Sequence, residues 1–144
     1  MGCYNSCIVD ASADRVWHAL RDFHDLSWAW GVIETVDRVG PKAPDQIGAQ
    51  RVLNGVFKET LLALDDNERE FSYSIDDGPD AVSPDRVSGY VGRVSVFPVT
   101  DGDKTFVAWS SSWRESQGGV EEFCDPIYKA LLGALQKHFA GDGK

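Results

Sequence analysis

The 144-residue sequence is short of basic side chains. It has 14 lysines and arginines against 23 aspartates and glutamates, which gives a net charge of −9 at pH 7 with neutral histidines. Binding to nucleic-acid phosphates requires clustered lysine and arginine, and the sequence has no such cluster. The same charge opposes contact with anionic lipid surfaces. We therefore expect no nucleic-acid partner and no electrostatic attachment to a membrane.

Cysteine is also scarce, and no CxxC pair is present. The chain has three cysteines: Cys3, Cys7 and Cys124. An odd number without a pairing motif is typical of reduced thiols in a cytoplasmic protein, and we expect that localisation. A nucleophilic role for Cys124 stays open. His18, His24 and His138 show no ligand spacing with these thiols, so we predict no metal site and no other cofactor.

Long apolar runs are missing as well. No stretch reaches the roughly 18 residues of a membrane span, and no signal peptide is visible. The first residues, MGCYNS, fit a loose myristoylation pattern at Gly2 and Ser6 with Cys3 beside it. The alternation that follows is typical of a strand, so we do not expect a lipid anchor. Phosphate-binding loops, GxSxG elbows and HExxH motifs are absent too.

The sequence contains enough hydrophobic residues to form one core. Hydrophobic residues make up 42% of the chain, which is ordinary for a globular protein. A domain of this length buries roughly 68–70% of the surface of its unfolded chain. We therefore predict a single domain over residues 1–144, present as a monomer or a homodimer.

Alternation of apolar and polar residues, bounded by turn residues, predicts a strand-rich protein. The segments with this pattern are 3–9, 32–39, 47–54, 56–65, 69–76, 87–99 and 104–115. The separators after Leu64 and after Thr100 are only a few residues long. Links this tight join antiparallel neighbours. The pattern therefore predicts one antiparallel sheet of seven strands.

Two short helical segments are predicted directly after the first strand. Ser12 is a suitable N-cap for a helix in which Val16 and Leu20 are four residues apart. The aromatic segment 24–31 then predicts a second short helix or turn, which ends at Gly31. These segments separate the first strand from the other six.

A long helix is predicted at the C-terminal end, over residues 120–139. Apolar residues recur there at helical spacing, although Pro126 lies inside the pattern. Either Asp125 caps a helix that starts at Pro126, or the helix starts near Gly119 and bends at the proline; we favour the second. One antiparallel sheet with helices on one face is an α+β arrangement.

Several local strings resemble a known family. They are VDASADRVWHALRDF at 9–23, FKETLLALDD at 57–66, FSYSID at 71–76, GYVGRVSVFPV at 89–99 and VAWSSSW at 107–113. With the helix at 120–139, they resemble the START/Bet v1-like (SRPBCC) superfamily over nearly the whole chain, and its polyketide cyclase/dehydrase-like branch in particular. Within that branch the sequence is similar to lachrymatory-factor-synthase-like proteins.

The resemblance implies a helix-grip fold. In this fold a curved antiparallel sheet of seven strands surrounds a long C-terminal helix, and two short helices after strand one close one end of a tunnel. Members bind lipids, hormones, polyketides or other hydrophobic molecules, and some are cofactor-free cyclases, dehydratases or isomerases. The fold therefore restricts the class of ligand but not the reaction.

Arg51 and Glu59 are the candidate catalytic residues. They lie on adjacent predicted strands, at positions that can be cross-strand neighbours. The resemblance to the plant synthases implies a role in isomerisation, since those enzymes use an arginine and a glutamate at matching strand positions. If both side chains point inward, Glu59 can transfer a proton and Arg51 can hold an oxygen-rich group. The alternative is an exposed ion pair at the sheet edge.

Strand and helix periodicity indicates which side chains face the predicted cavity. Aromatic rings dominate the inward positions, and they either line a pocket or simply fill the core. Trp28 and Trp30 in the turn-like segment are either contacts at the mouth or a plug. The predicted ligand-binding residues are Trp28, Trp30, Leu61, Tyr73, Tyr90, Trp109, Trp113, Phe123, Ile127 and Leu131.

Three functions are compatible with these residues. We favour a protein that binds a small hydrophobic or aromatic ligand, lipid-like or polyketide-like, between the sheet and the C-terminal helix. The first alternative is a cyclase, dehydratase or isomerase with Glu59 as the acid–base group and Arg51 positioning the substrate. The second is an interaction module whose cavity is filled. A preformed apolar cavity distinguishes the first two from the third.

Overall fold

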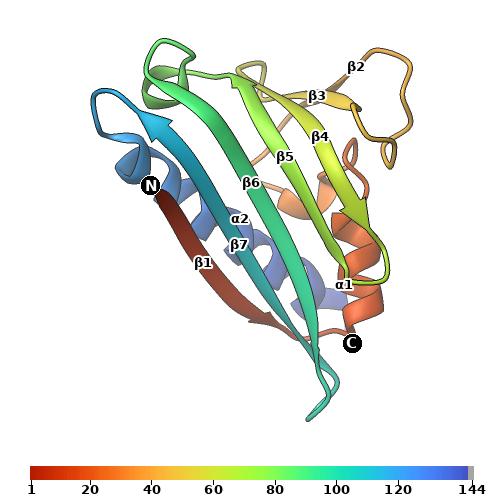
Figure 1. Ribbon diagram of the computed structural model, residues 1–144. Coiled ribbons are helices and arrows are strands. Elements are labelled where there is room, and N and C mark those ends of the chain that lie inside the picture. Colours follow the sequence, from red (N-terminus) through yellow and green to blue (C-terminus); the bar gives the residue numbers. More distant parts are fainter. Residues whose placement is uncertain (143–144) are drawn as a thin grey trace.

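Seven antiparallel strands form one sheet in a computed structural model that describes residues 1–142. The strands are β1 Gly2–Val9, β2 Val36–Val39, β3 Gln50–Leu53, β4 Phe57–Asp65, β5 Glu70–Asp77, β6 Val87–Val99 and β7 Lys104–Glu115. Their order across the sheet is β1-β7-β6-β5-β4-β3-β2. The sheet curves around α2, Val120–Asp142, which runs behind β1, β7 and β6 in Figure 1. The predicted helix-grip fold of the α+β class is confirmed.

The first short helix is α1, Ala13–Leu20, and it begins where the sequence predicts. The Ser12 hydroxyl accepts a hydrogen bond from the Arg15 N–H. Trp17 donates from its ring nitrogen to Asp66 at 2.8 Å, which fixes α1 against the turn of the β4–β5 hairpin (Figure 1). The second predicted helix is a single 3-10 turn, η1, Ser27–Ala29, and a further one, η2, spans Asp80–Val82.

The predicted strand over 32–39 is shorter than expected. Val32 and Ile33 both donate their backbone N–H to the Ala29 carbonyl at 3.0 Å. This turn uses the donors that strand pairing would need, so β2 begins only at Val36. The segment before it folds inward instead and places Ile33 against the core.

The long helix α2 contains Pro126 in its interior. Phe123 donates its N–H to the Gly119 carbonyl, so the helix is already formed before the proline. The alternative in which Pro126 is the first helical residue is therefore wrong. No helix within residues 1–142 has both the length and the apolar character needed to cross a membrane.

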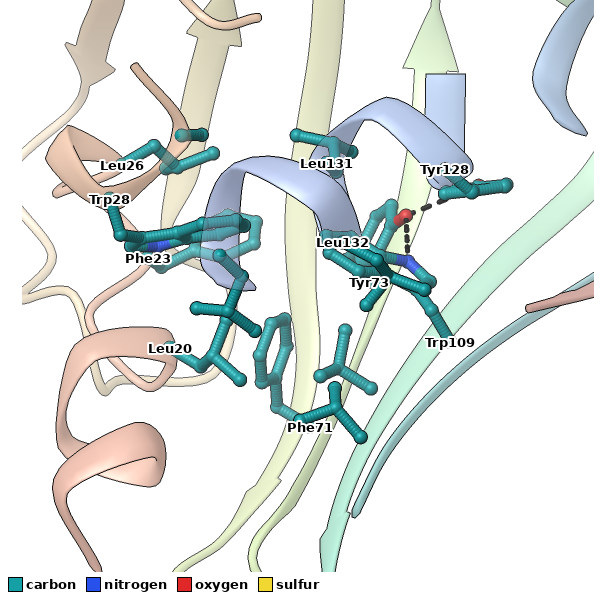
Figure 2. Close-up of a cluster of buried hydrophobic side chains, with 14 of the residues drawn as sticks. Leu20, Phe23, Leu26, Trp28, Phe71, Tyr73, Trp109, Tyr128, Leu131 and Leu132 are labelled. Carbon is teal, nitrogen blue, oxygen red and sulfur yellow. Dashed lines mark hydrogen bonds between the residues drawn. The ribbon is translucent and has the colours of Figure 1, made fainter. Parts of the chain in front are cut away.

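The core lies between the concave face of the sheet and the two α-helices. Figure 2 shows part of it, a cluster that contains Leu20 and Phe23 from the α1 end, Leu131 and Leu132 from α2 and Phe71 from β5. All five are buried. The side chains of α2 that form its buried stripe are Val120, Cys124, Tyr128, Leu131, Leu132, Leu135 and Phe139.

Candidate functional site

A small cavity lies between the sheet and α2. Its volume is about 40 Å³, which leaves room for roughly three water molecules, since one water needs about 10–15 Å³ of such space. The side chains that line it are Leu26, Ile33, Arg51, Leu53, Phe57, Glu59, Tyr73, Ile75, Trp109, Cys124, Ile127, Tyr128 and Leu131. The aromatic rings therefore leave a void, but one far smaller than the roughly 300 Å³ at the lower end of typical ligand pockets.

One part of the cavity wall is only half-buried. Ile33, Phe57, Ile75 and Ile127 are partly exposed, whereas Tyr73 and Trp109, which also line the cavity, are buried. Phe57 is held by a ring contact with Phe123 at 6.4 Å between centroids. A ligand larger than the present cavity would therefore enter most easily by displacing these half-buried side chains.

Arg51 and Glu59 form a buried ion pair in this wall. The two residues are directly opposite each other in the β3–β4 register and are only 4% and 5% exposed. Arg51 donates from Nε and from a terminal nitrogen to the same oxygen, Oε1 of Glu59, at 2.8 and 2.7 Å. The alternative of an exposed pair at the sheet edge is wrong.

The rest of the Arg51 guanidinium is also occupied. Its other terminal nitrogen donates to the Phe23 carbonyl at 3.1 Å, and its central carbon lies 3.8 Å from the centre of the Phe23 ring. Glu59 differs, because both hydrogen bonds from Arg51 go to Oε1; its second oxygen, Oε2, has no hydrogen bond within residues 1–142 and is not fully enclosed. The carboxylate thus presents one unused acceptor to a cavity lined mainly by apolar side chains.

The protonation of Glu59 is set by two opposing effects. Burial raises the pKa of its carboxyl, and the charge and hydrogen bonds of Arg51 lower it; the net result is a pKa above the ordinary value of 4.5. A carboxyl with a raised pKa gains and loses its proton nearer to neutral pH than an ordinary glutamate does. It is therefore suited to acid–base chemistry.

The raised pKa predicts that the difference in stability between the wild type and Glu59→Gln depends on pH. The pKa of Glu59 is raised in the folded protein. Its contribution to the free energy of unfolding is therefore complete below about pH 4.5 and is lost as the pH rises through the pKa of the folded protein. Compared with Glu59→Gln, the wild type should therefore lose stability as the pH rises above about 4.5. Urea unfolding of both proteins between pH 4 and 8 measures this; a difference that stays constant across the range would contradict it.

A chain of buried hydroxyls forms the side of the cavity nearest α2. Trp109 donates from its ring nitrogen to the Tyr73 hydroxyl at 3.0 Å, and that hydroxyl lies 3.3 Å from the Tyr128 hydroxyl (Figure 2). Tyr128 is also hydrogen-bonded to Tyr90. Burial raises the pKa of Tyr73 and of Tyr128 well above the ordinary value of 10. These hydroxyls therefore stay protonated at neutral pH.

Gly92 makes this arrangement possible. It is the β6 partner of Tyr73 in the sheet, and the end of the Tyr73 ring lies directly over it, where any Cβ on residue 92 would collide with the ring and its hydroxyl. The absence of a side chain therefore lets Tyr73 reach across β6 to Trp109 and Tyr128.

Cys124 lines the cavity but is a poor nucleophile. Burial raises the pKa of its thiol, which keeps the sulfur protonated, and the thiolate is the reactive form. Within residues 1–142 no group of histidine, cysteine, aspartate and glutamate side chains is arranged to hold a metal ion.

The predicted site residues fall into two groups. Those that line the cavity are Arg51, Glu59, Tyr73, Trp109, Ile127 and Leu131. The remaining predicted residues lie outside its wall: Leu61, Tyr90, Trp28 and Trp113 are buried, and Phe123 is half-buried.

Ring packing explains why the buried aromatics do not reach the void. Tyr90 stacks on Trp113 with centroids 5.5 Å apart, and Trp28 packs against Trp109 with centroids 6.3 Å apart. Trp30 is 87% exposed, so its position corrects the expectation that it borders the cavity. The turn at Ala29 to Gly31 directs it to solvent.

Several lining residues were missed by sequence reasoning. Phe57 and Ile75 alternate with Glu59 and Tyr73 on their strands, so the period-two pattern could have identified them. Cys124 and Tyr128 follow from helical spacing around Ile127. Leu26 and Ile33 have no such signal, because they come from irregular segments on either side of η1.

Comparison with known proteins agrees with this architecture. The family described as polyketide cyclase/dehydrase and lipid transport has a sequence model that matches residues 4–140. No curated protein matches the chain. A solved structure from Nitrosospira multiformis is 42% identical, with a TM-score of 0.94 over 96% of each chain.

More distant solved structures share the fold alone. The protein XoxI from Bacillus cereus is 22% identical, with a TM-score of 0.80 over 99% of this chain and 98% of its own. A protein from Thermobifida fusca is 24% identical, with a TM-score of 0.79 over 96% of this chain and 92% of its own. From the match over residues 4–140, we conclude that the chain belongs to the polyketide cyclase/dehydrase and lipid transport family.

Proposed function

We propose that this protein binds a small, mainly apolar molecule that carries a hydroxyl or a similar hydrogen-bond donor, in the cavity between the sheet and α2. The observation that carries the proposal is the unused Oε2 of Glu59 in a cavity wall made mainly of apolar side chains. A carboxylate oxygen that faces a cavity and has no protein partner can still accept a hydrogen bond. A ligand hydroxyl would supply that partner.

The dimensions of the cavity support a ligand of modest size. Room for roughly three water molecules corresponds to about 90 Å³ of liquid water, which is less than the roughly 150 Å³ of a cavity that binds benzene. Larger lipid-like or polyketide-like ligands would need the half-buried side chains Ile33, Phe57 and Ile127 to move. We therefore choose one-ring probes to test the site.

Fluorine NMR titration with 4-fluorophenol and fluorobenzene tests binding directly. We expect the wild type to bind both saturably and to prefer 4-fluorophenol, since only this probe can donate to Glu59. Glu59→Gln should weaken 4-fluorophenol binding about tenfold, because hydrogen bonds to charged acceptors are stronger by about 1 kcal/mol or more. Fluorobenzene affinity should change by less than twofold.

Blocking the cavity provides the matched control. Ile127 and Ala134 are both half-buried on α2, and only Ile127 lines the cavity. Ile127→Phe should reduce the affinity for both probes, whereas Ala134→Phe should leave it unchanged. If neither probe binds saturably, or if both variants behave alike, the proposed site is wrong.

A second candidate function, acid–base catalysis, is supported by the raised pKa of Glu59. In a cyclase, dehydratase or isomerase of this type, Glu59 would remove a proton from carbon next to a carbonyl and return it elsewhere. Arg51, held 2.7 Å from Oε1, would counter the charge that develops on the substrate oxygen. The free Oε2 is the oxygen that could take the proton.

Deuterium exchange into cyclohexanone tests this chemistry without knowledge of the natural substrate. If Glu59 acts as a base in the cavity, the wild type in D₂O should accelerate exchange of the protons next to the carbonyl, and Glu59→Gln should remove at least nine-tenths of that acceleration. Ile127→Phe should remove it as well. Equal rates in wild type and Glu59→Gln would exclude Glu59 as the base.

A further inference from the structure

Two adjacent residues of the segment after α1 are hydrogen-bonded to two adjacent residues of β3. The Phe23 carbonyl accepts from Nη1 of Arg51 at 3.1 Å, and Nε2 of His24 lies 2.9 Å from the Gln50 carbonyl oxygen. Within the segment, the His24 backbone N–H donates to Oδ1 of Asp22 at 3.0 Å. These contacts fasten the segment across β3 at the position of Arg51.

The hydrogen bond of His24 determines which ring nitrogen carries the proton. A carbonyl oxygen only accepts, so Nε2 must carry the proton and donate it to Gln50. Nδ1 is buried and has no hydrogen-bond partner within residues 1–142. The ring does not line the cavity, so His24 can affect a ligand there only through the residues that it holds.

The ion pair beside this segment has an uncommon arrangement. Arginine and carboxylate groups frequently form two parallel hydrogen bonds, one to each oxygen. Here Nε and Nη2 of Arg51 both donate to Oε1 of Glu59, at 2.8 and 2.7 Å. A small turn of the guanidinium would place one of these hydrogen bonds on Oε2 and remove the unused acceptor from the cavity.

Contacts with Phe23 explain why the guanidinium does not turn in this way. Nη1 of Arg51 is held by the Phe23 carbonyl, and the central carbon lies 3.8 Å from the centre of the Phe23 ring. The guanidinium is planar and rigid, so fixing Nη1 and one face also fixes the directions of Nε and Nη2. Phe23 is in turn held by its neighbour His24, which is bonded to β3.

We propose that His24 is a positioning residue that keeps Oε2 of Glu59 free for a ligand. Through Phe23 it holds the Arg51 guanidinium, so that both hydrogen bonds go to Oε1. Without the His24 donor, the segment can shift and Arg51 can turn to bond both oxygens. The inference rests on the proposed function and adds the residue that maintains the hydrogen-bond acceptor of that site.

His24→Asn tests this role, because the shorter side chain does not reach the Gln50 carbonyl. Arg51 should then cover Oε2, and the affinity for 4-fluorophenol should fall about fivefold, the equivalent of one net hydrogen bond. The affinity for fluorobenzene should stay within twofold of the wild type. The pKa of Glu59, followed by carbon-13 NMR of its carboxyl group, should be lower than in the wild type, because its second oxygen gains a hydrogen bond from a cation.

Three further variants separate the donor from the shape of the side chain. His24→Gln should restore the wild-type affinity and the wild-type pKa of Glu59, since its longer amide can donate to Gln50. His24→Phe keeps a ring but lacks the donor, so it should behave like His24→Asn. His18→Phe should change neither quantity, because His18 is exposed on α1.

The outcomes distinguish this role from the proposed function. If His24→Asn changes neither the preference for 4-fluorophenol nor the pKa of Glu59, the positioning role is wrong while the proposed cavity stands. Equal weakening of both probes would also overturn the role, since the cavity itself would then have changed. If the wild type binds neither probe, the proposed function fails; a lowered pKa of Glu59 in His24→Asn would still support control of Arg51 by His24, and an unchanged pKa would overturn it.

Discussion

Arg51→Met is expected to lower the free energy of unfolding by about 3–5 kcal/mol at neutral pH. The substitution leaves Glu59 in a site that is 5% exposed with no counter-charge. It also removes the donor to the Phe23 carbonyl and the cation that covers the Phe23 ring. Urea or thermal unfolding measures the loss.

Two controls separate the buried charge from ordinary loss of contacts. The double variant Arg51→Met, Glu59→Leu should recover most of the stability, because removing both charges leaves no unpaired group. Arg93 pairs with Glu70 on the outer surface, with side chains that are 54% and 41% exposed. Arg93→Met should therefore change stability by only about 0–1 kcal/mol. An equal loss in Arg51→Met and Arg93→Met would show that the cavity pair is not desolvated.

Gly92→Ala is expected to destabilise the protein by about 3 kcal/mol, at the upper end of overpacking effects. The new Cβ would collide with the end of the Tyr73 ring, whose hydroxyl is held between Trp109 and Tyr128. Moving the ring would also break its hydrogen bond with Trp109. Chemical denaturation measures the change, and near-ultraviolet circular dichroism reports the altered tyrosine and tryptophan packing.

Gly133 offers the opposite case with the same chemical change. It lies inside α2, and nothing is within 4 Å of the position its Cβ would take. Gly133→Ala should therefore stabilise the protein by about 0.5–1 kcal/mol, since alanine restricts the unfolded chain and favours helix. If both glycine variants shift stability in the same direction, the close approach of Tyr73 to β6 is not as described.

The strands were predictable where local pattern and tertiary environment agree. The expected bounds 87–99 and 104–115 coincide with β6 and β7, because one face of each strand is buried and the other exposed along most of its length. The strand expected from residue 32 failed in its first half. Its first apolar residues, Val32 and Ile33, pack against the core instead, because the backbone turns at Ala29.

The site was predictable in part for the same reason. Arg51 and Glu59 have fixed positions on paired strands, so their proximity follows from register. Their burial depends on Phe23 and on Leu26 and Ile33, which irregular segments bring over the sheet. The size of the cavity depends on how closely Tyr73 approaches Gly92. Neither the burial of the ion pair nor the size of the cavity produces a periodic pattern in the sequence.

The most direct test of the binding site is to locate bound 4-fluorophenol by intermolecular nuclear Overhauser effects. Contacts between its ring protons and the methyl groups of Leu26, Ile127 and Leu131 would place it between the sheet and α2, as the lining residues predict. Contacts confined to the exposed residues Ile8 and Ile47 would mean that the probe binds only at the surface. That result would contradict a ligand site built on Glu59.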